Sequence, residues 1–189
     1  MIPETILSIL LGLGLAASVG FRVFVPLFVL SLSAHFNIIP LHENWIWIGS
    51  TTAMMTFGIA TLIEIVAYLI PWVDHLLDLI TIPLATIAGT LVMLATISNL
   101  DPLLSWTLAI IAGGGTATLI KSSSSTQRLA STTTTAGTAN PLISSVETLG
   151  SFGISTLSIF FPLLSFLLLL FLFWILYKFF RILKPKNRD

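Results

Sequence analysis

The stretch "GFRVFVP", residues 20–26, places a permanently charged guanidinium inside a run that is otherwise apolar from Ile6 to Ala34. A charged side chain at bilayer depth costs at least about 2.5 kcal/mol on insertion scales, so such residues mostly face a protein interior or a wet cavity. We therefore expect Arg22 to line a polar site within a membrane. The alternative is that Arg22 lies near the headgroup region and extends its charge into water.

The composition is typical of an integral membrane protein. Of the 189 residues, 56% are hydrophobic and 8% are charged, and the mean hydropathy is +1.03. A soluble domain is about 25% charged, and several windows here exceed the roughly 18 apolar residues of a spanning helix. The net charge of zero argues against a nucleic-acid partner. The absence of cysteine excludes disulfides. We expect an all-α polytopic protein whose residues 1–189 form a single integral-membrane domain.

Helix breakers and segment lengths predict about five spanning helices with broken and interfacial segments between them. As helix, residues 5–36 would extend about 45 Å, too long for one untilted span of a roughly 30 Å hydrocarbon core. We expect two half-helices that meet near Gly20, and the alternative is one long kinked helix. Further spans are expected over residues 45–70, 84–100, 103–120 and 157–177.

Two further segments are expected to lie partly in the membrane. Residues 71–83, bounded by prolines, predict an interfacial or re-entrant helix. Residues 142–156 predict a half-span or a re-entrant arm. Because residues 5–36 are also interrupted, an inverted repeat is a hypothesis for this chain.

Basic residues gather at the end of the chain. Five of the eight Lys and Arg residues lie within residues 178–189. The positive-inside tendency therefore predicts a cytoplasmic C-terminal tail.

Four acidic or imidazole side chains stand out in the second and third apolar regions. Glu64 is the natural counter-ion for Arg22 if their helices are neighbours, and otherwise it meets water at the end of its span. Asp74, His75 and Asp78 share one side of a helix and suit a proton relay or a divalent cation. The alternative is the polar face of an amphipathic surface helix. The spacing matches no dedicated zinc motif, so we assign no metal ligand and expect no cofactor.

Residues 121–141, "KSSSSTQRLASTTTTAGTANP", form a Ser/Thr-rich polar segment that contains Lys121, Arg128 and Asn140. Its low hydrophobicity is compatible with a disordered cytoplasmic loop. Small hydroxyl residues also satisfy broken helices and allow close packing in membranes. We expect an extended stretch that lines a cavity, with Asn140 facing a ligand.

Four motifs together resemble a known family: "GLGLAASVGFRVFVPL" (12–27), "PWVDHLLDLI" (71–80), "PLATIAGTL" (83–91) and "KSSSSTQRLASTTTTAGTANPLISSVE" (121–147). They are similar to the bacterial integral-membrane family catalogued as domain of unknown function 4126. The resemblance implies several helices, a bacterial inner (plasma) membrane and no settled activity. A looser similarity in architecture links the chain to polyprenyl-phosphate flippases, whose re-entrant hairpins present arginines and carboxylates at mid-membrane. The motif positions in this chain are Arg22, Asp74, Asp78, Lys121, Asn140 and Glu147.

These features favour a small transporter or lipid flippase that moves an anionic small molecule or lipid through a polar intramembrane cavity. The anion would be bound by positive side chains, an amide and half-helix N-termini. Carboxylates and a histidine would couple the movement to protons or cations. The binding residues are Arg22, Lys121, Arg128 and Asn140, and the coupling residues are Glu64, Asp74, His75, Asp78 and Glu147.

Two other function classes remain open. A non-catalytic scaffold or accessory subunit would use the Ser/Thr-rich segment and the basic tail to dock partners or anionic lipid. An intramembrane metal-dependent hydrolase would use Asp74, His75 and Asp78. Recognised nucleophile and metalloprotease motifs are absent from the sequence, so we assign no catalytic residue and favour a protein that is not an enzyme. Membrane lipids are expected partners, and a homo-oligomer is left open.

Overall fold

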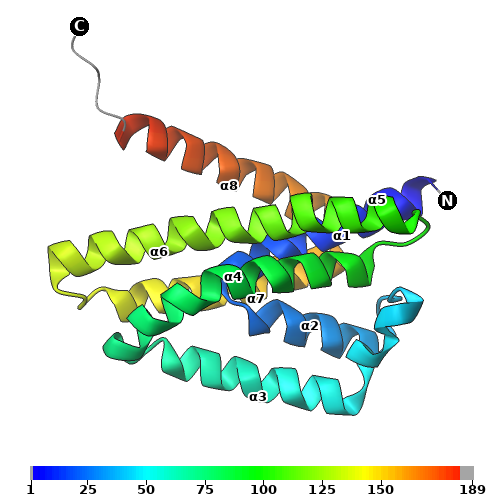
Figure 1. Cartoon of the computed structure of the whole chain (residues 1–189), viewed down its shortest axis with the longest axis horizontal. Coiled ribbons are helices and arrows are strands. Elements are labelled where there is room, and N and C mark those ends of the chain that lie inside the picture. The colour runs from blue at the N-terminus through cyan, green and yellow to red at the C-terminus, as the bar shows by residue number, and fades with distance from the viewer. Residues whose placement is uncertain (1, 184–189) are drawn as a thin grey trace, which may run out of the picture.

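The computed structural model describes the backbone of residues 2–183, with the side chains of that range except those of residues 2, 3, 71, 72, 74, 75, 176 and 179–183. All regular structure in this part of the chain is helical (Figure 1), which confirms the predicted fold class. In chain order the elements are α1 (Ile2–Phe21), α2 (Phe24–His35), the 3-10 helix η1 (Glu43–Gly49), α3 (Thr51–Ala67), α4 (Pro71–Thr96), α5 (Pro102–Leu108), the π-helix η2 (Ala109–Gly114), α6 (Gly115–Thr135), α7 (Asn140–Phe160) and α8 (Pro162–Leu183).

Within the described residues, four helices are long and apolar enough to cross a membrane. A fifth span results if η1 and α3, which are bent by 63° relative to each other, count as one broken span. The chain is therefore a multi-pass membrane protein with about five spans. The four segments are Glu4–Phe21, Leu76–Thr96, Pro102–Thr135 and Asn140–Phe160.

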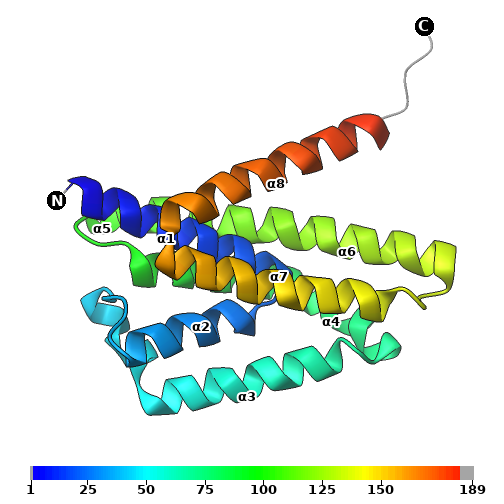
Figure 2. The same cartoon turned by 180° about the vertical axis from the view of Figure 1, so that it is seen from behind.

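The first apolar segment is a hairpin of two helices. The predicted break is confirmed, but only α2 is a half-helix, because α1 has 20 residues and is long enough to span. α1 ends at Phe21 and α2 begins at Phe24, so the break lies at Arg22 and Val23. α2 runs back toward the end of the molecule where α1 begins (Figure 1 and Figure 2). The 12 residues of α2 measure about 18 Å at 1.5 Å per residue, which is less than a hydrocarbon core of about 30 Å. α2 alone is therefore too short to span the core, whereas α1, with 20 residues, extends about 30 Å and is long enough.

The prediction of a separate interfacial or re-entrant helix over residues 71–83 is wrong. α4 runs without interruption from Pro71 to Thr96 and contains Pro83. Pro71 occupies the first turn, where its missing N–H has no helical partner. Pro83 removes one hydrogen bond inside the helix. Membrane helices tolerate this loss because neighbouring groups can satisfy the freed carbonyl.

The Ser/Thr-rich residues 121–141 are helical up to Thr135, so the predicted extended stretch and the alternative loop are both wrong. They prolong the predicted fourth span into one continuous helix of 34 residues, Pro102–Thr135. Hydroxyl groups of this helix donate to carbonyls one turn earlier, as Ser123 does to Leu119 at 2.8 Å. Hydroxyls that are satisfied within their own helix need no cavity or loop as a partner.

α7 is a helix of 21 residues, and the predicted half-span over residues 142–156 is therefore wrong. At 1.5 Å per residue it extends about 30 Å, which matches the thickness of the hydrocarbon core. The inverted-repeat hypothesis depended on pairing this segment with the α1–α2 hairpin. Since α7 is not interrupted, that argument no longer holds.

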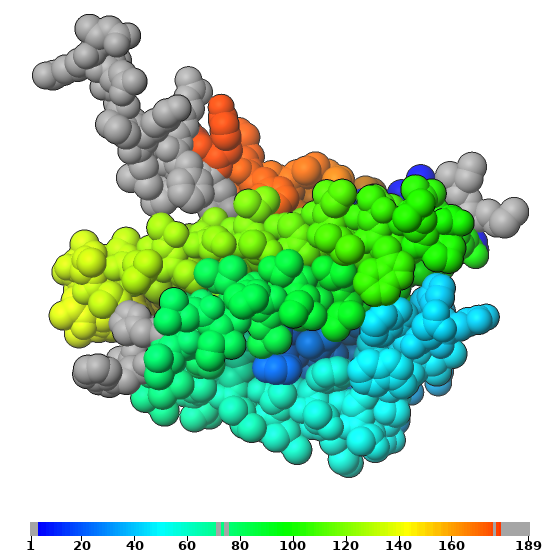
Figure 3. All heavy atoms as spheres, viewed as in Figure 1, coloured from blue at the N-terminus to red at the C-terminus, as the bar shows by residue number. Residues whose placement is uncertain are grey.

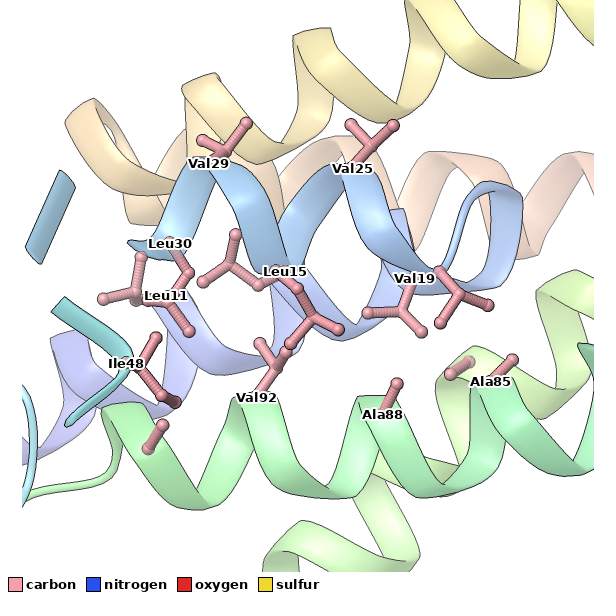
Figure 4. Packing of buried hydrophobic residues seen from close by; sticks show 14 of the residues in the cluster. Leu11, Leu15, Val19, Val25, Val29, Leu30, Ile48, Ala85, Ala88 and Val92 are labelled. Carbon is pink, nitrogen blue, oxygen red and sulfur yellow. The ribbon is translucent and has the colours of Figure 1, made fainter. Parts of the chain in front are cut away.

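The main apolar core packs the hairpin against α4. Leu15 and Val19 of α1, Leu30 of α2 and Val92 of α4 are fully buried in one cluster (Figure 4). On the face drawn in Figure 3, α3 and α4 leave only a small blue part of the hairpin visible. The hairpin is therefore enclosed by the bundle on this face.

Serines connect the hairpin to α7 on its other side. Ser18 Oγ donates to the Ser151 carbonyl at 2.7 Å and lies 2.6 Å from Ser155 Oγ. Small hydroxyl residues of this kind let membrane helices approach closely and bond across the contact. Arg22 follows Ser18 by one turn, on the same face. This contact therefore directs Arg22 toward α7.

α4 and the helix formed by α5, η2 and α6 touch backbone to backbone at two glycines. A Cβ built on Gly89 would lie 2.9 Å from the Gly113 carbonyl oxygen, and one on Gly113 would lie 2.7 Å from the Gly89 oxygen. A side chain at either position would push the two helices apart.

We expect Gly89→Ala to lower the free energy of unfolding by about 1–3 kcal/mol, because an extra carbon in a filled contact forces backbone shifts. Thermal unfolding in detergent measures this loss. Gly115→Ala is the matched control, since a Cβ there meets nothing within 4 Å. The packing argument fails if Gly89→Ala is as stable as Gly115→Ala.

Candidate functional site

Three cationic side chains converge on the ring of Tyr68. The ring centroid lies 4.0 Å from Arg22 Cζ, 4.6 Å from Arg128 Cζ and 4.8 Å from Lys121 Nζ. Each of these residues is only 1% exposed. A cation over an aromatic face gains about 2 kcal/mol when it is desolvated, which offsets only part of the cost of burying a charge. We call this group and its two paired carboxylates the tyrosine cluster: Arg22, Tyr68, Asp78, Lys121, Arg128 and Glu147.

Arg22 enters the cluster from the tip of the α1–α2 hairpin. Its Nε donates to Thr148 Oγ1 at 3.0 Å, and its Nη2 donates to the Ser144 carbonyl at 2.9 Å and also to Ser144 Oγ. The guanidinium therefore faces α7 and the protein interior. This burial agrees with the predicted polar site and not with the alternative in which Arg22 extends into headgroups.

Glu147 of α7 is the carboxylate that contacts both arginines. Its Oε2 accepts a hydrogen bond from Arg128 Nη2 and lies 3.9 Å from Arg22 Nη2. Its Oε1 accepts from Arg128 Nε at 3.3 Å and from the hydroxyl of Ser124. Lys121, Ser124 and Arg128 recur every three or four residues, so α6 presents them on one face. The helical form of the Ser/Thr-rich segment is thus what aligns its two cations.

The second ion pair joins α4 to α6. Lys121 Nζ lies 3.1 Å from Asp78 Oδ1 and donates to the Tyr68 hydroxyl at 2.8 Å. The same hydroxyl donates to Asp78 Oδ1 at 3.5 Å and lies 3.1 Å from Thr81 Oγ1. Tyr68 therefore provides both a ring for the cations and a hydroxyl that ties the ammonium to α4.

The predicted direct ion pair between Arg22 and Glu64 is not formed, because the carboxylate within ion-pair distance of Arg22 is Glu147, while Glu64 attracts Arg22 over a longer distance. Glu64 instead accepts hydrogen bonds from the backbone N–H groups of Val23 at 2.8 Å and Phe24 at 2.9 Å. The first N–H groups of a helix have no partner inside it, and a carboxylate there also complements the helix dipole. Glu64 of α3 therefore caps α2 and stabilises the turn that carries Arg22.

Asn140, Asp74 and His75 are the remaining residues that the sequence predicts for the site. Asn140 is the first residue of α7, and its amide donates to Thr132 Oγ1 at 3.1 Å, which joins α7 to α6 across their turn. Asp74 and His75 belong to α4, and their side chains lie outside the described residues. The side chains that are described contain no group of three His, Cys, Asp or Glu residues that could hold a metal ion.

Two buried donors at the cluster, Arg22 Nη1 and Ser125 Oγ, have no hydrogen-bond partner in the described part of the chain. Ser125 lies on α6 four residues after Lys121 and three before Arg128, on the face directed at Tyr68. An unpaired buried donor costs about 1–3 kcal/mol, and more when it belongs to a charged group. The arrangement is chemically suited to an acceptor-rich ligand such as an oxyanion.

A cavity of about 450 Å³ lies beside Glu147, between α6, α7, α8 and the end of α1. Ser123, Ser124, Gln127 and Glu147 form its polar part, and the rest of its lining is mainly apolar. α8 diverges from α6 toward its C-terminal end in both views (Figure 1 and Figure 2). The cavity therefore extends from the tyrosine cluster into the angle between α8 and the bundle.

The sequence pattern alone does not predict several residues of the site. Tyr68 and Ser125 contribute the ring and a hydroxyl, while Ser144 and Thr148 bind Arg22. One signal could have found the tyrosine, since it follows Glu64 by one helical turn and so shares its face. The serines and the threonine are indistinguishable from their many neighbours of the same type until the helices are packed.

Comparison with known proteins identifies the family. Residues 9–181 match the family described as "Domain of unknown function (DUF4126)", and the chain belongs to it. No curated protein and no solved structure matches the chain. The match covers every helix that contributes to the tyrosine cluster.

We expect Tyr68→Phe to lower the free energy of unfolding by about 1–3 kcal/mol, because the Lys121 ammonium and Thr81 lose a buried hydrogen-bond partner. Thermal unfolding in detergent is the measurement, and Tyr177→Phe is the control because Tyr177 is 67% exposed. Equal stability of the two variants would contradict a structural role for the hydroxyl.

Proposed function

We propose that this protein is a membrane transporter that moves an anionic group, carried by a small molecule or a lipid, across the bilayer. The observation that carries the proposal is the Arg22 guanidinium, buried at a hairpin tip with Nη1 unpaired in the described part of the chain. A charged group inside a membrane is costly and typically marks a substrate or ion pathway. An anion that accepted hydrogen bonds from Nη1 and Ser125 would offset that cost.

Glu147 and the substrate anion would both bind the two arginines, and this competition provides a means of coupling transport to a second ion. Glu147 and an anionic substrate would compete for Arg22 and Arg128, because both present oxygen acceptors to the same N–H groups. When the anion binds, Glu147 loses part of its contact with the arginines, and this exchange of partners would couple anion binding to the movement of a proton or cation. With a proton as the coupling ion, a proton gradient can drive the anion.

The hairpin supports transport rather than a fixed binding site. Its shorter arm, α2, returns toward the end of the bundle where α1 begins, so the chain is interrupted at the turn that carries Arg22 (Figure 1). Discontinuous helices of this type commonly form the binding sites of secondary transporters. The turn is held by Glu64 through two backbone hydrogen bonds.

We further place the protein in the bacterial inner (plasma) membrane with its C-terminus in the cytoplasm. Five of eight basic residues lie in residues 178–189, which supports this orientation by the positive-inside tendency. The turn between α6 and α7 lies at the same end of the molecule as the end of α8, so it would also be cytoplasmic (Figure 2). The tyrosine cluster would then open toward the cytoplasmic half of the bilayer.

Transport is tested with the full chain in proteoliposomes, using two probes. Fluorescent phosphatidylglycerol, read by dithionite quenching, reports lipid movement, and radiolabelled phosphate reports uptake of a small anion. We expect the protein to accelerate one of the two and Arg22→Gln to slow that rate at least about tenfold, a loss of about 1.4 kcal/mol in transition-state stabilisation.

The control is Lys178→Gln, which removes one positive charge at a side chain that lies over Trp174 and outside the cluster. It should transport as the unchanged protein does. The proposal fails if neither probe moves, or if Arg22→Gln transports as fast as Lys178→Gln.

Coupling gives a separate prediction. Glu147→Gln keeps the shape of the side chain and an acceptor for Ser124, but it cannot exchange a proton. We expect its transport to lose dependence on an imposed proton gradient, measured as the ratio of rates with and without the gradient. A variant that still responds to the gradient as the unchanged protein does would exclude Glu147 as the coupling group.

A further inference from the structure

The ring of Tyr68 lies at the point where the three cations of the tyrosine cluster converge. The distance to its centroid is 4.0 Å from Arg22 Cζ, 4.6 Å from Arg128 Cζ and 4.8 Å from Lys121 Nζ. Tyr68 and each of the three cations are 1% exposed. An anion from outside therefore reaches the cations only if a side chain that covers them moves.

The ring balances positive charge but leaves hydrogen-bond donors unused. Its face attracts cations through its quadrupole, yet it presents no oxygen to an N–H or O–H group. Arg22 Nη1 and the Ser125 hydroxyl have no hydrogen-bond partner in the described part of the chain. An oxyanion in the place of the ring would attract the same charges and would also accept these hydrogen bonds. The ring is therefore an incomplete substitute for an anion.

The position of Tyr68 in the chain allows its ring to leave this place. Tyr68 follows the last residue of α3, and two residues separate it from Pro71 at the start of α4. α3 packs mainly against α2 and η1, and part of the hairpin is visible between α3 and α4 (Figure 3). The Tyr68 hydroxyl accepts from Lys121 Nζ at 2.8 Å and lies 3.1 Å from Thr81 Oγ1. These polar contacts hold the ring over the cations.

We propose that Tyr68 is a gate residue whose ring holds the place of a phosphate group and is displaced when that group binds. The inference rests on the proposed function and narrows its anion to a phosphate group, either free or carried by a lipid. A phosphate monoester presents three strong acceptor oxygens, one for each cation, whereas a carboxylate has two. Arginine also binds phosphate oxygens in bidentate pairs.

The test measures anion binding by the full chain in detergent before and after the ring is removed. Thermal unfolding at increasing concentrations of inorganic phosphate, dioleoyl phosphatidate or acetate gives each Kd, because a ligand of the folded state stabilises it by mass action. We expect Tyr68→Ala to bind phosphate or phosphatidate at least about tenfold more tightly than the unchanged protein. Acetate at the same ionic strength should show no gain. A gain with inorganic phosphate supports a free anion, and a gain confined to phosphatidate supports a lipid-borne phosphate.

Two further variants isolate the effect of the ring. Tyr177→Ala removes a side chain that is 67% exposed, so it should bind phosphate as the unchanged protein does. Tyr68→Ala combined with Arg22→Gln should lose the gain, because the opened space then lacks one cation. If Tyr68→Ala does not fold, Tyr68→Phe keeps the ring but removes the hydroxyl that binds Lys121. A gain of at least about threefold is then expected.

Four results would overturn the inference. Weaker phosphate binding by Tyr68→Ala would show that the ring is part of the binding site, and unchanged binding would show that it does not cover the site. An equal gain for acetate would exclude selection of a phosphate group. A gain that survives Arg22→Gln would place the anion away from the tyrosine cluster.

The outcome also separates this inference from the proposed function. If Arg22→Gln transports normally while Tyr68→Ala gains phosphate affinity, the cluster binds phosphate and the transport proposal is wrong. If Arg22→Gln slows movement of a probe while Tyr68→Ala gains no affinity, transport stands and the gate assignment is wrong.

Discussion

The burial of three positive charges around one aromatic ring is the constraint on which the rest of the structure depends. Transferring an ion from water to a protein interior costs several kcal/mol, and attraction to a counter-ion compensates only when hydrogen bonds satisfy the remaining donors. Arg22 from the hairpin and Lys121 and Arg128 from α6 are each 1% exposed, and they obtain these partners from α4, α7 and Tyr68 at the end of α3. Five elements must therefore pack correctly before any of the three charges is accommodated.

The hairpin shows how this constraint shapes the backbone. A continuous helix over residues 5–36 would carry the chain beyond Arg22 past the cluster, whereas the break at Arg22 and Val23 stops α1 there and returns the chain as α2. The return exposes backbone N–H groups at the start of α2, and Glu64 accepts two of them. Glu64 thus supports the turn, and Glu147 forms the ion pair with Arg22.

The helices that carry the tyrosine cluster are held firmly, but two hydrogen-bond donors at the cluster have no partner in the described part of the chain. Apolar packing, serine contacts and two backbone-to-backbone glycine contacts hold the helices that carry the cluster. Within this frame, Arg22 Nη1 and Ser125 Oγ keep unused donors in the described part of the chain, and Glu147, which contacts Arg22, lines a cavity. Buried polar groups in native proteins are almost always paired. The unpaired donors of Arg22 and Ser125 are therefore better explained by binding of a ligand than by a contribution to stability.

The sequence by itself determined that the chain is an all-α membrane protein. Its composition and the lengths of its segments show this, because a helix buried in lipid requires a long apolar run. The cost of a charge in such a run singled out Arg22, Glu64 and Glu147. The sequence could not show which carboxylate pairs with Arg22, since positions 64 and 147 are equally plausible until α7 lies against α1. It also could not show that residues 121–135 are helical, because local propensity disfavours Ser and Thr there. Only tertiary structure decided both, because long-range packing brings Glu147 to Arg22 and places partners for Lys121, Ser124 and Arg128 of α6 on neighbouring helices.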